Sequence, residues 1–243
     1  MYLQITASKD TYITDKIVPV GSGTRATDAN VGLASTIDIF KLYGETALGD
    51  STAKTEISRG LISFNVADIS ASLKDKVSFD SDNFKCTLKL YDVQGSSVAP
   101  SNFNLIVYPI SRSFDEGRGQ DLAHFNDLDT ANFVTSSFSN NIHYLWNTQG
   151  AKAEGLLNST DIDIIGSGTL AGTSSRINLY KTQYFEKGTE DLEIDITTIV
   201  SASMVGLLPT YTGSLGLLIA FSGSEESDSK TRFVKRFASR HTR

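Results

Sequence analysis

The chain has 243 residues, of which 40% are hydrophobic and 21% are charged, and its formal net charge is −6. The acidic balance argues against a general nucleic-acid coat, which needs clustered cations to neutralise phosphates. Its single cysteine, Cys86, excludes an intrachain disulfide, and we expect this residue to be a small buried hydrophobe. The first residues lack a signal-peptide pattern, and no apolar run approaches the roughly 20 residues of a membrane helix. We therefore expect synthesis in a cytoplasm and no membrane partner.

Short runs in which apolar and polar residues alternate predict strands along most of the chain. The runs lie at residues 3–8, 36–43, 57–66, 84–93, 104–110, 176–179, 192–196, 217–221 and 232–237. Helical spacing is weak at residues 66–73, where Asp68 is a candidate cap. It is clearer at residues 197–206, where Asp195 or Thr197 could cap the helix and Gly206 could end it.

Residues 115–170 differ from the rest because they are long, polar and punctuated by glycine. We expect them to form a loop-rich insertion that projects from the fold and serves a function or an interface, since loops of this length are uncommon in compact domains.

Strands that do not alternate with helices predict an all-β protein. We expect one antiparallel β-sandwich of jelly-roll type, with at most one or two short helices, as a single domain over residues 1–243. The predicted core consists of Phe84, Cys86, Leu88, Leu90, Ile106, Leu192, Ile194, Ile196, Leu217, Ile219 and Phe237.

The chain contains no Walker loop, no GxSxG motif and no HExxH motif. None of its histidines, His124, His143 and His241, has a second ligand at a zinc spacing, and we expect His143 to be solvated or hydrogen-bonded. We predict a protein that is not an enzyme. It is expected to have no catalytic, cofactor-binding or metal-binding residue and to use no cofactor.

Two further kinds of binding site stay open at this point. Calcium takes several oxygen ligands, and two acidic stretches could supply them. Neither has the spacing of an EF-hand loop, and such stretches are more often a solvated face. The aspartates concerned are Asp121, Asp127, Asp129, Asp161 and Asp163. Tyr144 and Trp146 could form a platform on which a glycan stacks; the alternative is that Trp146 fills a core or an interface.

Residues 216–243 predict an apolar strand, a polar turn and a second, basic strand. An unpaired edge strand exposes a row of backbone donors and acceptors. We therefore expect residues 231–239 to gain a neighbour by β-augmentation, either from sequence beyond Arg243 or from another subunit. The predicted partner interface comprises Arg232, Phe233, Lys235, Arg236, Phe237 and Arg240. The alternative is that these cations form ion pairs across the hairpin with the acidic residues of the turn.

Several segments together resemble the DNRLRE-type β-sandwich domain, a jelly-roll-like module of extracellular and carbohydrate-binding proteins. They are ASKDTYI at 7–13, DANVG at 28–32, ISRGLISFNVADI at 57–69, KCTLKLYDV at 85–93, LEIDITTIV at 192–200, and the stretch from GLLIAFSGSEE to RFASRH at 216–241. In that family a closing strand follows the last of these segments. The resemblance implies the same fold and supplies no catalytic residue.

A second resemblance spans nearly the whole chain and is to virion structural proteins of tailed marine bacteriophages, in particular those that infect cyanobacteria. It is carried by TASKDTYITDKI, FKLYGE, LKLYDV, SRSFDEGRG, KGTEDLEIDIT and SGSEESDSKTRFVKRFASRHT. It implies a structural component of the virion in the tail, baseplate, neck or fibre-attachment region, with other virion proteins and copies of itself as partners. The alternative is a carbohydrate-binding module that adheres to host surface polysaccharide. A depolymerase comes third.

Overall fold

The computed structural model describes residues 2–18, 24–43, 55–73, 76, 78–79, 81–93, 100–169, 175–209 and 213–242. Fourteen strands and three helices lie in these ranges. No helix among them is long and apolar enough to span a membrane.

The main sheet has seven strands, and six of them follow the order β11-β5-β13-β3-β2-β14, while β1 pairs with β3. All pairs within it are antiparallel. Its members are β1 (Lys9–Thr14), β2 (Thr36–Tyr43), β3 (Thr55–Asn65), β5 (Phe103–Pro109), β11 (Lys181–Phe185), β13 (Ser214–Phe221) and β14 (Phe233–Ala238).

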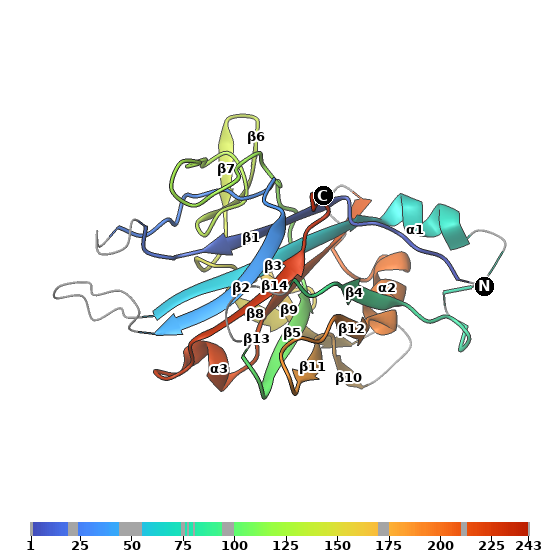
Figure 1. Ribbon diagram of the computed structural model, residues 1–243. Helices are drawn as coiled ribbons and strands as arrows, with labels where there is room; N and C mark the ends of the chain where they lie inside the picture. The colour runs from blue at the N-terminus through green and yellow to red at the C-terminus, as the bar shows by residue number, and fades with distance from the viewer. Residues whose placement is uncertain are drawn as a thin grey trace.

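The sheet curls along β3, so that β2 and β14 lie over the other strands as a second layer (Figure 1). A Cβ on Gly60 of β3 would lie 3.0 Å from Cγ2 of Ile37 in β2, so glycine is what permits this close approach. A separate antiparallel pair, β4 (Thr87–Leu90) and β12 (Leu192–Asp195), extends the second layer. The predicted all-β antiparallel sandwich is confirmed.

Alternate residues of β13 enter two different cores. Leu217 and Ile219 pack into the main core between the two layers, whereas Leu218 and Ala220 enter a second core on the outer face of the main sheet. Because β13 is covered on both faces, its apolar run is nearly continuous instead of alternating.

The region predicted as a loop-rich insertion, residues 115–170, contains four short strands in its described part. They are β6 (Thr135–Ser139), β7 (Ile142–Leu145), β8 (Glu154–Leu156) and β9 (Ile164–Thr169), and β9 also pairs with β10 (Arg176–Asn178). The β8–β9 pair is parallel. Only the β6–β7 hairpin stands away from the sheets, at the top of Figure 1, while Trp146 and Ile164 close the second core.

The two predicted helices are present as α1 (Val66–Leu73) and α2 (Thr197–Met204). Asp195 Oδ1 accepts a hydrogen bond from the Thr197 amide before α2, and Gly206 follows it at φ 73°. At α1 the corresponding acceptor is Asn65, whose Oδ1 receives the Ala67 amide, instead of the predicted Asp68. A third helix, the single turn α3 (Ser224–Ser227), was not predicted.

Nine of the eleven predicted core residues are buried: Phe84, Leu88, Ile106, Leu192, Ile194, Ile196, Leu217, Ile219 and Phe237. Cys86 and Leu90 are half-buried and pack against the main core. Burial raises the pKa of the Cys86 thiol to about 11, so this cysteine is a neutral packing residue at physiological pH.

Candidate functional site

The hairpin β6–β7 is formed by its turn. Asn140 and Asn141 have φ values of 52° and 60°, and a two-residue hairpin turn of type I′ requires positive φ at both central positions. Asparagine tolerates this conformation better than most residues with a side chain. The sequence SNNI therefore specifies a tight hairpin, and this is the signal in the sequence that reveals it.

The base of the hairpin is held by Asn132 and Trp146. The Trp146 indole Nε1 donates to the Asn132 carbonyl at 2.9 Å, and the Trp146 amide donates to the Val134 carbonyl at 3.0 Å. The Asn132 side-chain oxygen accepts the amides of Val134 and Thr135. Because Trp146 is packed in the second core, the hairpin stands on a fixed base.

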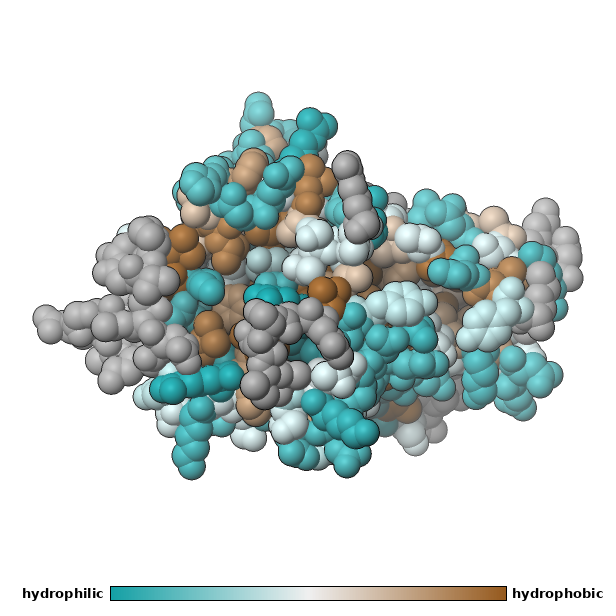
Figure 2. All heavy atoms as spheres, viewed as in Figure 1, coloured by the Kyte–Doolittle hydropathy of each residue, from teal (hydrophilic) through white to brown (hydrophobic). Residues whose placement is uncertain are grey.

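The outward strand of the hairpin carries apolar side chains into solvent. Ile142 is 55% exposed and Leu145 is 52% exposed, and Tyr144 between them is also exposed. They border a shallow hollow of about 490 Å³. We call this the hairpin surface; it is lined by Leu128, Val134, Thr135, Asn141, Ile142, His143 and Leu145. Figure 2 shows a few hydrophobic side chains among the hydrophilic ones on this projection.

Polar groups beside the hairpin surface are engaged within the chain. His143 Nε2 lies 2.8 Å from Asp129 Oδ1, which confirms that His143 is hydrogen-bonded. Asp127 Oδ1 accepts the Asp129 amide, and Asp121 Oδ1 accepts two amides of its own turn. Asp163 is buried and accepts the amides of residues 147, 148 and 153. These carboxylates therefore cap turns, which is an ordinary structural role for aspartate in loops.

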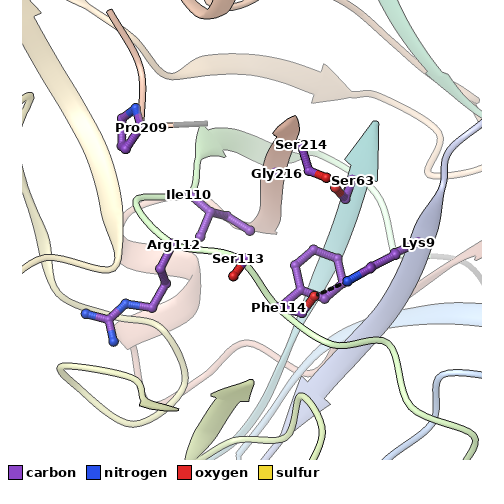
Figure 3. Close-up of a pocket in the computed structure, with 9 residues that line it drawn as sticks. All are labelled: Lys9, Ser63, Ile110, Arg112, Ser113, Phe114, Pro209, Ser214 and Gly216. Carbon is purple, nitrogen blue, oxygen red and sulfur yellow. Dashed lines mark hydrogen bonds between the residues drawn. The ribbon is translucent and has the colours of Figure 1, made fainter. Parts of the chain in front are cut away.

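A second, much smaller hollow lies beside the first strand (Figure 3). It measures about 10 Å³, roughly the space of one water molecule. Lys9 Nζ donates to the Phe114 carbonyl at 2.9 Å on one side of it, and Arg112 lies on another side. This hollow is too small for an organic ligand.

The predicted glycan platform of Tyr144 and Trp146 does not form. Trp146 is only 4% exposed, because its ring fills the second core and its Nε1 is satisfied by the Asn132 carbonyl. Tyr144 is exposed without it, so the alternative assignment of Trp146 as a core residue is correct.

The expectation that the carboxyl-terminal strand lacks a neighbour is wrong. β14 pairs with β2 from Phe233↔Lys41 to Ala238↔Thr36. Its other edge also receives backbone partners, since the Ala238 amide donates to the Tyr91 carbonyl and the Val93 amide donates to the Arg236 carbonyl.

The interface predicted on this strand is turned largely inward. Phe237 is 0% exposed, and the ammonium of Lys235 is buried between the rings of Phe185 and Phe237, at 5.1 and 5.0 Å from their centroids. Lys235 also pairs with Asp92. The strand therefore anchors the second layer of the sandwich.

The remaining cations of this strand form ion pairs or hydrogen bonds elsewhere in the chain. Arg236 pairs with Asp38 at 3.1 Å, and Arg240 with Glu116 at 2.5 Å. Arg232 Nε donates to the Tyr43 carbonyl. The pairing partners are therefore not the acidic turn residues that the sequence suggested. Phe233 is half-buried, which leaves Arg232, Arg236 and Arg240 as the members of the predicted interface that reach the surface.

Neither a protein-family model nor a curated protein matches this chain. The two resemblances noted in the sequence are therefore hypotheses, and the fold and the hairpin surface are the structural observations on which a function can be argued.

Proposed function

We propose that the protein is a non-enzymatic structural component of a bacteriophage particle, in its tail, baseplate, neck or fibre-attachment region, and that it acts through protein–protein assembly. The observation that carries this proposal is the hairpin surface, which presents Ile142 and Leu145 to solvent on a fixed base. The sequence resemblance to virion proteins of tailed marine phages supplies the setting.

Exposed apolar side chains in a group, rimmed by polar groups, are characteristic of protein-binding surfaces. Here Leu128 joins Ile142 and Leu145 around the hollow, and Asp129 and His143 stand beside them. Burying one such aliphatic side chain stabilises a complex by about 1.5–3 kcal/mol. The fixed turn and base also lower the entropy lost on docking, because little of the hairpin has to be ordered.

We assign the hairpin surface to a neighbouring virion protein that inserts an apolar side chain into the hollow. An apolar side chain suits the hollow better than a glycan, because Trp146, the aromatic ring that would stack on a sugar, is buried. A second copy of this chain and a host glycan are the other occupants that the experiment must separate.

The setting is tested by mass spectrometry of purified phage particles. We expect the protein in particles at a stoichiometric level. Its presence in infected cytoplasm alone would contradict a structural role.

The surface is tested by the double variant Ile142→Glu, Leu145→Glu. We expect it to fold as the wild type does and to lose incorporation into particles at least about tenfold, because two charges would have to be buried. Val205→Glu is a matched control, since Val205 is comparably exposed at the end of α2. Equal incorporation of both variants would refute the assignment. If the double variant instead loses self-association, the occupant is a second copy of this chain. If it loses binding to a glycan array, the occupant is a host glycan.

A further inference from the structure

Three segments that are distant in the sequence meet at the end of the sandwich where the chain terminates. Asp10 in β1, Glu116 in the loop after β5 and His241 after β14 each place one nitrogen or oxygen atom within 4.8 Å of the others. In Figure 1 the carboxyl-terminal end lies beside the chain that leads into β1. Arg240 adjoins the cluster through its pair with Glu116.

Backbone contacts fix the geometry of this cluster. The Arg240 amide donates to Asp10 Oδ2 at 2.6 Å, and the Asp10 amide donates to Glu116 Oε1 at 2.8 Å. The His241 amide donates to the Ser239 hydroxyl at 3.0 Å. The cluster is therefore held together before any ligand arrives.

Close backbone packing holds Glu116 in the same way. Asn30 Nδ2 donates to the Glu116 carbonyl at 2.8 Å. A Cβ on Gly32 would lie 2.0 Å from that carbonyl oxygen, so only glycine fits there.

Two atoms of the cluster are buried and lack a hydrogen bond within the described ranges. They are Asp10 Oδ1 and His241 Nε2. Asp10 is only 4% exposed, so water does not satisfy it readily. Buried side-chain oxygens and nitrogens are nearly always partnered in folded proteins. His241 Nε2 lies 3.5 Å from Glu116 Oε1, an ion-pair contact without a hydrogen bond. Asp10 Oδ1 and His241 Nε2, the two atoms without a hydrogen bond, together point to a ligand that accepts electron pairs from both.

The charges of the cluster favour a cation. Arg240 forms a two-point ion pair with Glu116, through Nε and a terminal nitrogen. Asp10 accepts a hydrogen bond from one backbone amide and from no side chain among the residues that the structure describes. A cation at Asp10 Oδ1 would give this buried carboxylate oxygen the partner that it lacks among the described residues.

We propose that Asp10, Glu116 and His241 bind a divalent transition-metal cation of the zinc class, which ties the end of the chain to β1. Imidazole together with carboxylate suits such cations, whereas calcium and magnesium prefer oxygen ligands alone. Asp10 Oδ1 and His241 Nε2 are the principal ligands. Glu116 is the weaker third, because its Oε1 already accepts the amide of Asp10 and Nε of Arg240. Water completes the coordination, as in three-ligand zinc sites.

This site could not be predicted from the sequence, because Asp10 and Glu116 are more than a hundred residues apart along the chain. A tetrahedral zinc site with ligands at 2.0–2.2 Å requires ligand atoms roughly 3.5 Å apart. His241 Nε2 already lies 3.5 Å from Glu116 Oε1, and the ligand atoms all lie within 4.8 Å of one another, so only a small contraction is needed on binding.

A proton is the competing occupant. Protonated His241 could donate Nε2–H to Asp10 Oδ1 and satisfy both orphaned atoms without a metal. The chain also offers internal controls, because His143 and His124 each lie beside a single aspartate, at 2.8 and 3.0 Å, in exposed positions. His241 differs from these two histidines because it lies beside two carboxylates, one of which is buried.

The test uses the full chain after treatment with a chelator. Zinc chloride is added at pH 7 while binding is followed by calorimetry and the three histidine side chains by ¹⁵N NMR. We expect one equivalent of zinc, a raised Tm, and a shift of the His241 Nε2 resonance with little change at His124 and His143. Calcium chloride should produce none of these effects.

Two variants complete the test. Asp10→Asn and His241→Gln should each weaken zinc binding at least about tenfold, the order found when support for a metal ligand is removed. The double variant His124→Gln, His143→Gln should bind as the wild type does. Absence of saturable zinc binding, or an unshifted His241 resonance in the wild type, would overturn the proposal in favour of a proton. Loss of binding in the double variant would assign the metal to the exposed histidines.

Discussion

The carboxyl-terminal strand β14 and the strand β7 of the projecting hairpin contrast in where they place their side chains. β14 is rich in lysine and arginine, yet Lys235 and Phe237 are buried. β7 reads IHYL, with two aliphatic residues in four, yet all four of its residues are exposed. The burial of Lys235 and the exposure of Ile142 and Leu145 are both the reverse of what hydropathy alone predicts for these side chains.

The difference lies in what each strand has on its two edges. β14 has β2 on one edge and residues of the Tyr91 segment on the other, so its inward side chains are covered, and the ammonium of Lys235 finds Asp92 and two backbone carbonyls. Among the described residues, β7 pairs with a strand on one edge alone, and that strand is β6. A charged side chain can be buried where hydrogen-bond and ion-pair partners surround it. An apolar side chain can be exposed where no second layer of the fold covers it.

The largest expected effect comes from truncating the buried ring of β14. Phe237→Ala should lower the free energy of unfolding by about 3–5 kcal/mol, because a ring that fills the main core leaves a cavity. Ile142→Ala in the hairpin surface should change it by less than about 0.5 kcal/mol. Urea unfolding of both variants measures the difference. Equal effects would mean that the two strands are equally buried.

The buried cation of β14 gives the next effect. Lys235→Met should cost about 3 kcal/mol, since the charge of Asp92 is left without its buried partner. Arg236→Met is the control on the same strand, because its pair with Asp38 is at the surface and such pairs contribute at most about 1 kcal/mol. Thermal unfolding of the two variants tests this. A Lys235 variant as stable as the Arg236 variant would show that the ammonium is solvated.

Strands that are buried on one face or on both faces could be predicted well from the sequence. TIDIFKLY alternates over most of its length, and β2 has the predicted bounds Thr36–Tyr43. The apolar run of β13 was equally plain. The alternation at residues 84–93 extends beyond the strand β4, because its partner β12 offers only four residues for pairing.

Strand β7, which was missed, gives no such pattern. β7 is exposed on both faces, so alternation carries no information there, and only the Asn140–Asn141 turn marks the hairpin. The candidate sites depend on contacts across the fold. Trp146 was recognised as notable, but whether it faces a core or a glycan depends on the Asn132 carbonyl that satisfies its Nε1.

The hairpin turn offers a smaller effect that would sharpen the comparison. Asn141→Ala should destabilise the hairpin by about 1 kcal/mol, because alanine at φ 60° clashes with its own backbone. Asn141→Gly should be neutral or slightly stabilising. Hydrogen exchange of the β6–β7 amides is the measurement, with the β14 amides as reference. If Asn141→Ala speeds exchange more in β14 than in β7, the expectation that this substitution affects the hairpin alone is wrong.

The smallest effect concerns the turn that leads into β14, and it depends on pH. Asp228 accepts the amides of Thr231 and Lys230 at 2.8 and 3.0 Å, and these bonds, with the Thr231 hydroxyl and nearby Lys41, lower its pKa below the ordinary value of 3.8. The folded state therefore favours the ionised form. Its contribution to stability is fully present above the pKa of the unfolded chain and is lost as the pH falls through the lower pKa of the folded state.

Asp228→Asn should consequently reduce stability by a constant amount from pH 7 down to about pH 5, and by progressively less below pH 4. Urea unfolding of the wild type and the variant across this range measures the change. A difference that stays constant down to pH 2 would show that the turn is held by the geometry of residue 228, which asparagine shares, and that its charge contributes nothing. In that case the electrostatic part of the anchor of β14 would come from Lys235 and its pair with Asp92, and the turn would contribute through its backbone geometry alone.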